Sequence, residues 1–365
     1  LATRRAARGF SLIEIMVGLM IGMFAMVIVM QVFAAAEGNK RTTTGGNDAQ
    51  TSATLALYSL QRDIRQAGQG ISALPILGCS LSYTTASSGE AVTLDALAPV
   101  VINPAKVPKG DDNTDTLLVV AGSSGDSSEG DRLTGVSTAS TLAVTVPSSF
   151  AQGDWVIAAP AAREEPCALV MGKISAPITG AVLPVSNATA GRAVDDIVYN
   201  LGGSPSIRAY AVRGGQLKSC DYLAYNCAFV DDTRWVAVAG GMASLRARYA
   251  RDTTTYTDGV SMTGVASAYD QVTPGSAGDA NPLGLVLKCR WARVIGVQLA
   301  VVARNAQHEK GYTAATPSWV GSGTLPIVVD TTAGYRFKTL EVSAPLRNMI
   351  WQGSQNTHED GSGGC

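Results

Sequence analysis

One carboxylate within an apolar segment constrains this chain more than any other residue. A short arginine-rich stretch ends in Gly9, and an apolar run follows over residues 10–36 with Glu14 as its only charged side chain. Ionised groups within a bilayer helix are expensive and rare, and they mark functional sites. Glu14 therefore predicts a role beyond that of a simple membrane anchor.

Two simpler segments share part of this pattern, a secretory signal peptide and a plain signal anchor. A signal peptide would be cut after Ala36, but the apolar run exceeds the roughly 7–15 residues of such a region and contains Glu14. A signal anchor fits by length, because residues 15–36 can cross a hydrocarbon core of roughly 30 Å. The arginines before Gly9 favour a cytoplasmic N-terminus in either case.

The order of Gly9, Phe10, Glu14 and a long apolar tail resembles the class III signal of type IV pilins and type II secretion pseudopilins. In those families a prepilin peptidase cuts after the Gly and methylates the new N-terminal Phe. The resemblance implies that residues 1–9 are a class III leader and that Phe10 becomes N-methylated. It also implies that residues 10–36 form the transmembrane half of an N-terminal helix.

Glu14 is the candidate assembly residue. The amine freed at Phe10 would be largely protonated at neutral pH. If a neighbouring helix is staggered by one subunit, this amine can meet Glu14, and at about 4 Å with an effective dielectric constant near 20 the attraction is about 4 kcal/mol. We expect the pair to set the register of assembly, because only one stagger neutralises both charges.

The rest of the chain has the composition of a loop-rich β domain. Only 16% of the 365 residues are charged, and 39 are Gly. The net charge is −1, and residues 1–36 carry +2, so the remainder carries −3. The exported part of the chain therefore lacks the excess of positive charge that is typical of a nucleic-acid-binding protein, and we expect no nucleic-acid partner.

Residues 37–70 are expected to form a helix that first weakens and then becomes amphipathic. Residues 37–48 are rich in Gly, Asn and Thr, which are poor helix formers. An apolar stripe with helical spacing follows and comprises Ala53, Leu57, Leu60, Ile64 and Ala67. The other faces of this helix carry Gln61, Arg62, Asp63, Arg65 and Gln66. Gly68 and Gly70 predict the end of the helix.

Residues 71–365 are expected to form the β-rich exported domain. Short apolar runs alternate with turn residues and predict strands at 116–121, 141–146, 155–159, 168–174, 207–212, 235–239, 244–249, 292–304 and 336–343. Residues 103–115, 122–131 and 250–282 are predicted loops. The fold class is therefore α+β, with a long membrane-spanning helix followed by a pilin-type domain, which the resemblance implies to contain two antiparallel sheets.

All six cysteines follow the apolar segment: Cys79, Cys167, Cys220, Cys227, Cys289 and Cys365. An even number in an exported domain fits a disulfide framework, and six cysteines allow 15 pairings. Cys220 and Cys227 flank a short loop and are the easiest pair to accept, while a bridge from Cys365 would hold the end of the chain. Free buried thiols are the alternative. No CxxC spacing occurs, so no metal site is expected.

Four segments narrow the resemblance to the PilW family of minor pilins. They are residues 60–68 (LQRDIRQAG) with Cys79 soon after, 115–120 (DTLLVV), 235–252 (WVAVAGGMASLRARYARD) and 335–348, which contains YRFKTLEV and PLRN. Ala250 stands where the family usually has Gly. The resemblance implies a low-abundance pilin in a minor-pilin complex that primes pilus assembly and lies at the filament tip. The alternative is a J-type pseudopilin of type II secretion, which has the same order of helix and β domain.

The implied partners are other minor pilins, the major pilin, a tip adhesin, the prepilin peptidase and an inner-membrane assembly platform. The implied location is the inner membrane before assembly, as a single-pass protein with a cytoplasmic N-terminus, and the cell-surface pilus tip afterwards.

The sequence contains no catalytic motif. It lacks a Walker A loop, a Gly-x-Ser-x-Gly elbow and a His-Glu-x-x-His pair, and only His308 and His358 could support histidine-based catalysis. We expect a non-enzymatic protein without cofactors and without catalytic residues. Residues 111–115 resemble the start of a calcium loop but lack the later Gly and Glu of an EF-hand. Asp126, Glu129 and Asp131 could join an irregular Ca²⁺ site, and a solvated acidic loop is the favoured alternative.

Overall fold

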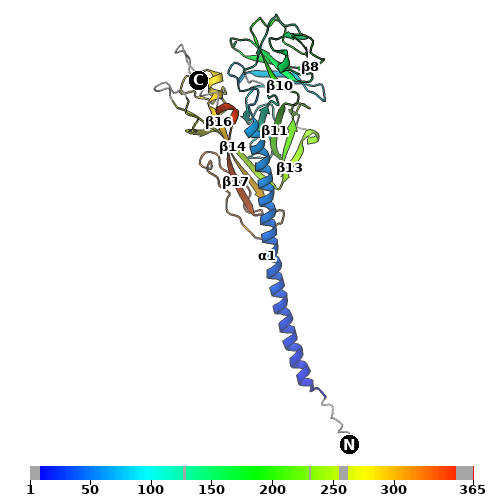
Figure 1. The fold of residues 1–365 in the computed structure, drawn as a ribbon. Coiled ribbons are helices and arrows are strands. Elements are labelled where there is room, and N and C mark those ends of the chain that lie inside the picture. Colours follow the sequence, from blue (N-terminus) through cyan, green and yellow to red (C-terminus); the bar gives the residue numbers. More distant parts are fainter. Residues whose placement is uncertain (1–8, 126–128, 230–231, 255–261, 351–364) are drawn as a thin grey trace.

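The computed structural model describes the chain except residues 1–8, 126–128, 230–231, 255–261, 351–364 and the side chains of residues 41–42 and 232. One helix, α1 (Leu12–Gln66), forms a stem, and the β domain surrounds its C-terminal half (Figure 1). The expected fold class is confirmed, since a long apolar N-terminal helix precedes a β-rich domain of antiparallel sheets. Of the described helices, α1 alone is long and apolar enough to cross a membrane.

Three sheets build the β domain. The first is farthest from the N-terminus and contains β1 (Ser80–Thr84), β2 (Ala91–Leu94), β5 (Asp131–Arg132), β6 (Thr141–Ala143), β7 (Trp155–Ala159), β8 (Ala168–Ile174), β9 (Val182–Ser186) and β10 (Ile197–Gly202). The second has the order β13–β12–β11–β4–β3, formed by β3 (Val100–Ile102), β4 (Leu117–Ala121), β11 (Ser206–Arg213), β12 (Gln216–Asp221) and β13 (Val236–Gly240).

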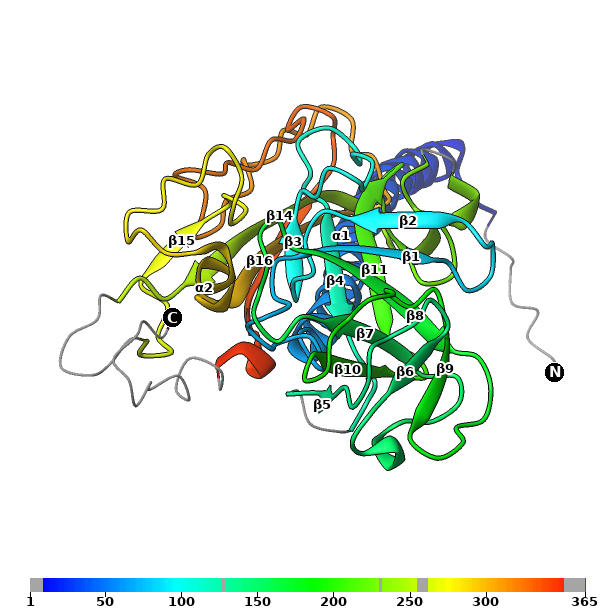
Figure 2. The ribbon, with the colours of Figure 1, turned by 90° about the horizontal axis from the view of Figure 1, so that it is seen from above.

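The third sheet has the order β15–β14–β16–β17, formed by β14 (Met242–Arg251), β15 (Ala268–Asp270), β16 (Val294–Arg304) and β17 (Phe337–Pro345). A short helix, α2 (Leu287–Ala292), precedes β16, and two 3₁₀ turns lie at Pro147–Ser149 and Asp232–Arg234. Helix α1 packs against β17, β16, β13 and β4, so the second and third sheets enclose it (Figure 2).

Three clusters of buried side chains stabilise this arrangement. The main core joins α1 to all three sheets, from Ala49 on the helix to Leu299 on β16. A second core fills the distal lobe between β6, β7, β9 and β10. A third lies under residues 305–335, where Trp319 and Ile327 cover the outer face of β16.

The helix does not weaken at residues 37–48, so this expectation is wrong. α1 is continuous through the segment. Gly45 is buried, and a Cβ there would lie 3.2 Å from the Cβ of Asn305, so the glycine permits a close approach. Helix already exists on both sides, and extending a helix avoids the cost of nucleation. Intrinsic propensity is a weak constraint under these conditions.

The apolar stripe is present in the structure and begins earlier than expected. The buried positions of the stripe on α1 are Gly45, Ala49, Ala53, Ala56, Leu60 and Ile64, Ala67 is buried directly after the helix, and Leu57 is half-buried. The helix ends where expected: Gln66 is its last residue, and Gly68 follows with φ +87°. Only glycine adopts this left-handed conformation at low cost.

The sheets differ from the expectation in their number and in the direction of one strand pair. The described residues form three sheets rather than two, and β1 pairs with β8 in parallel. All nine expected strands are present, most of them with shifted ends. The strand expected over residues 292–304 begins at Val294, because residue 292 is the last residue of α2. The strands that the sequence did not predict are short or rich in polar residues, namely β1, β2, β3, β5, β9, β10, β12 and β15.

Asp63 is buried, although the sequence placed it on the outer faces of the helix. Its side chain accepts hydrogen bonds from the Tyr210 hydroxyl at 2.5 Å, from Arg208 Nη1 at 3.1 Å and from Arg62 Nε at 3.0 Å. Burial, followed by the hydrogen bond to Asp63, raises the pKa of Tyr210 above its usual value. The cluster fixes α1 to β11 at one position and orientation.

We expect Asp63→Ala to lower the free energy of unfolding by about 1–3 kcal/mol, because it leaves buried donors without an acceptor. Chemical denaturation of the full chain in detergent measures this change. Arg65→Ala is the matched control, because Arg65 is exposed on the same turn of α1. Equal stability of the two variants would contradict a structural role for Asp63.

Candidate functional site

The expected cleavage site lies in an accessible segment before α1. Gly9 and Phe10 are exposed and non-helical, and no atom lies within 4 Å of the position that a Cβ on Gly9 would take. The Phe10 side chain is 85% exposed. A peptidase can therefore reach the Gly9–Phe10 bond without unfolding any described element.

Glu14 takes part in the N-terminal cap of α1. Its Oε2 accepts a hydrogen bond from the Ser11 backbone N–H at 2.9 Å, and the Ser11 side chain accepts from the backbone of the first turn. This reciprocal arrangement is a capping box. Ser11 is not among the site residues predicted from the sequence, although Ser-x-x-Glu spacing before an apolar run indicates a capping box.

The surface around Glu14 is apolar and uncovered. The described side chains of α1 before Gly45 are exposed, including its large apolar side chains from Leu12 to Phe33. Residues 10–36 extend about 40 Å as a helix, which exceeds a hydrocarbon core of roughly 30 Å. Such a surface requires lipid or other apolar helices around it.

The acidic loop residues have structural partners. Asp111 accepts hydrogen bonds from the backbone N–H groups of Gly214 and Gly215, both at 2.8 Å. Asp115 is buried and is engaged by Arg246 Nη1 at 3.3 Å and Gln271 Nε2 at 2.7 Å. These contacts account for two of the three carboxylates in residues 111–115.

The second acidic group also gives no metal site in the described chain. Asp131 accepts from the Val146 N–H at 2.6 Å, and Asp126 lies outside the described residues. Among the residues that the structure describes, no group of three or more His, Cys, Asp or Glu side chains is placed to hold a metal ion.

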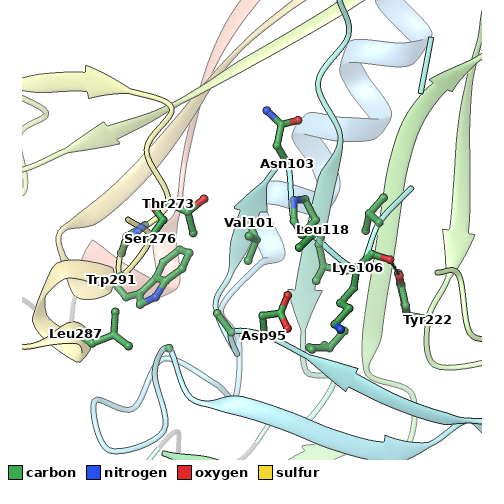
Figure 3. Close-up of a pocket in the computed structure, with 18 residues that line it drawn as sticks. Asp95, Val101, Asn103, Lys106, Leu118, Tyr222, Thr273, Ser276, Leu287 and Trp291 are labelled. Atoms are coloured by element: carbon green, nitrogen blue, oxygen red, sulfur yellow. Dashed lines mark hydrogen bonds between the residues drawn. The ribbon is translucent and has the colours of Figure 1, made fainter. Parts of the chain in front are cut away.

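A cavity of about 350 Å³ lies where the three sheets meet, and its walls are mainly apolar. Figure 3 shows Trp291 and Leu287 on one side, with Asp95, Lys106 and Tyr222 across from them. The Tyr222 hydroxyl donates to the Lys106 carbonyl at 2.6 Å. The Trp291 ring packs against Gly78, where a side chain would have no room. We assign this cavity to the packing of the sheets.

The structure joins the six cysteines in three pairs. Cys79 is bonded to Cys167, Cys220 to Cys227, and Cys289 to Cys365. The first bond links the segment between α1 and β1 to the residue before β8, and the third holds Cys365 against α2. The Arg293 Nε also donates to the Cys365 carbonyl at 2.8 Å.

The short disulfide loop is anchored by Glu90. Its carboxylate binds both terminal nitrogens of Arg234, at 2.7 and 3.0 Å, and accepts from the Asn226 N–H at 3.1 Å. The hydrogen bonds from Arg234, Ser88 and the Asn226 backbone lower the pKa of Glu90 to about 2. The Arg234 guanidinium also lies over the Phe229 ring at 5.3 Å. The loop is thereby held at the edge of the second sheet.

Comparison with known proteins supports the N-terminal assignment. Residues 4–30 match the family model of the prokaryotic N-terminal methylation motif. No curated protein matches the chain. Among solved structures, a type IV-like pilin from Thermus thermophilus matches with 12% identity and a TM-score of 0.33, over 82% of this chain and 97% of that chain. The chain thus carries an N-terminal methylation motif of the kind found in prepilins, and the finer PilW resemblance concerns segments between residues 60 and 348, which this motif does not cover.

We expect protein purified from an oxidising compartment to contain no titratable thiol under denaturing conditions. In the chain-entropy model, replacing Cys289 and Cys365 by Ser costs about 4.5 kcal/mol, against about 2.5 kcal/mol for Cys220 and Cys227, because the first pair closes the longer loop. Thiol titration and denaturation of the two double variants measure these effects. Six reactive thiols in the native protein would contradict the framework.

Proposed function

We propose that this chain is a minor pilin of a type IV pilus, processed between Gly9 and Phe10 and assembled through α1. The methylation motif over residues 4–30 carries the proposal, because it lies on a helix with an uncovered apolar half. The PilW resemblance adds the finer role, in which the subunit joins other minor pilins, primes assembly and lies at the tip beneath an adhesin.

The division of α1 into two halves supports this proposal. From Gly45 onward the helix belongs to the β domain, and over residues 12–36 it is an exposed apolar rod. A rod of this kind is stable in a membrane and equally stable among the helices of a filament, since both surround it with apolar atoms. The same surface therefore serves before and after assembly.

Glu14 supplies the specific contact in this proposal. A carboxylate at this depth is costly in lipid, and a neighbouring subunit's Phe10 amine would neutralise it. Its hydrogen bond to Ser11 gives it a second role, because a capping box stabilises the helix start. The two roles make different predictions for conservative substitutions.

Processing is the first test of the proposal. We expect mass spectrometry of the exported protein to find an N-methylated Phe10 as the first residue. Gly9→Leu should leave an unprocessed membrane protein that does not enter filaments, because the side chain fills the accessible position next to the scissile bond. An N-terminus after Ala36 would identify an ordinary signal peptide and refute the proposal.

Replacing Glu14 by Gln separates the cap from the charge. Gln can still accept the Ser11 hydrogen bond, but it cannot neutralise an amine. We expect the Glu14→Gln protein to insert in the membrane and to be processed. The amount that co-purifies with partner pilins should fall at least about tenfold. The lost attraction is about 4 kcal/mol, and solvent and local rearrangement reduce its effect.

Ser11→Ala is the matched control, because it removes the other half of the capping box and keeps the carboxylate. It should assemble normally, as judged by co-purification from membranes and by counts of surface pili. If Ser11→Ala fails and Glu14→Gln assembles, Glu14 acts as a helix cap and the charge pairing is excluded.

A further inference from the structure

A group of basic and aromatic side chains lies at the membrane-proximal end of the third sheet, where β16 ends and β17 begins. We define this basal patch by Arg304, Lys310, Arg336 and Lys338 with the rings of Tyr312 and Tyr335. Asn305 connects the patch to the helix, because a Cβ at Gly45 would lie 3.2 Å from the Asn305 Cβ. In Figure 1 this end of β17 faces the N-terminal half of α1.

The patch lies just beyond the lipid headgroup layer if α1 spans the membrane. Gly45 lies nine positions after Ala36, the last residue of the apolar run, which corresponds to about 14 Å along the helix. The headgroup layer on each side of a bilayer is about 5–8 Å thick. Long Arg and Lys side chains extend their charged ends across the remaining gap.

Three cations of the patch have no acidic partner in the described chain. The Arg304 guanidinium lies over the Tyr335 ring at 4.6 Å and makes no hydrogen bond or ion pair with any described residue. Lys310 and Lys338 are exposed and equally unpaired among the described residues. Arg336 differs, because Glu309 binds it at 2.7 and 2.9 Å and Tyr312 lies under it at 4.2 Å.

The nearby carboxylates reduce this positive charge without cancelling it. Glu309 is engaged by Arg336, and this bond lowers the pKa of Glu309. Asp330 accepts from Thr332 at 2.7 Å, and Asp111 is held by two backbone N–H groups. The four cations and Glu309 sum to +3, and adding the charges of Asp330 and Asp111 leaves +1, whereas residues 37–365 carry −3 as a whole. Positive charge is therefore concentrated on the face nearest the membrane.

We propose that the basal patch docks on anionic phospholipid headgroups of the membrane that α1 crosses. The inference depends on the membrane-spanning helix of the proposed function, but not on the identity of the assembled filament. The unpaired cations bind the phosphates, and the two tyrosines suit the interface between headgroups and water. Docking holds the β domain against the bilayer and fixes the tilt of α1 before assembly.

Lipid is a better occupant than a protein for this patch. The patch lies at the end of β17 that is nearer the N-terminal half of α1 (Figure 1), and its unpaired charges lie on exposed Arg and Lys side chains rather than in an apolar pocket. Each Lys or Arg near an anionic surface contributes about fivefold in affinity, so three act together without precise geometry.

The test uses the full chain in nanodiscs of phosphatidylcholine alone or mixed with phosphatidylglycerol. Hydrogen exchange is followed at residues 304–312 and 334–338. We expect exchange there to slow by about fivefold or more with the anionic lipid, and high salt to reverse the effect. The triple variant Arg304→Gln, Lys310→Gln and Lys338→Gln should lose this response.

The matched control removes three exposed cations away from the patch, with Arg65→Gln, Arg132→Gln and Lys173→Gln. It should keep the response to anionic lipid. Equal exchange in both lipids for a chain that inserts in nanodiscs would overturn the docking inference alone. Protection that requires a second pilin subunit and not anionic lipid would assign the patch to a protein interface and also overturn it. A chain that does not insert would contradict the proposed function as well.

Discussion

The close packing of one helix face against two sheets is the constraint on which the structure depends. Gly45, Ala49, Ala53 and Ala56 present almost no side chain, so the sheets can approach the helix backbone. Leu60 and Ile64 then fill the wider space near the end of the helix, and each buried side chain of this size contributes about 1.5–3 kcal/mol. Because this face continues directly from the membrane segment, the helix cannot bend away without exposing the main core.

One continuous helix therefore lies in two different environments. Its N-terminal half is uncovered in the isolated subunit, whereas its C-terminal half is part of a protein core. Asp63 marks the second environment, because its hydrogen bonds to Tyr210 and Arg208 select one rotation of the helix about its axis. That rotation also determines which side of α1 presents Glu14, so an interaction in the β domain sets the orientation of the charge in the membrane segment.

The sequence predicted features that depend on neighbours along the chain. The methylation signal, the apolar stripe, the helix end at Gly68 and the long strands all follow from local spacing. Features that depend on distant partners could not be predicted in this way. Tyr210 lies 147 positions after Asp63, and nothing near Asp63 indicates that a hydroxyl will reach it. Gly45 was read as a helix breaker because its partner, Asn305, is known only from the fold.

The basal patch shows the same limit for charge. Arg304 and Lys310 belong to one segment and Arg336 and Lys338 to another, with 25 residues between Lys310 and Arg336. Neither segment alone has enough positive charge to predict a basic patch, and the net charge of the domain is negative. The pairing of β16 with β17, which places Arg304 opposite Phe337, brings the four cations together.

The geometry at the start of α1 allows both roles of Glu14 at once. Oε2 accepts the Ser11 N–H, while Oε1 has no hydrogen bond to any described residue. A carboxylate has about four acceptor positions on its two oxygens, so capping leaves room for a further donor. Cleavage before Phe10 would create a positive charge at the positive end of the helix dipole, which is unfavourable. A carboxylate already fixed in the first turn can offset that charge on its own helix or on a neighbour's. In the proposed filament, the neighbour's amine would have to be the better placed of the two, and burial among apolar helices would remove the water that otherwise solvates it.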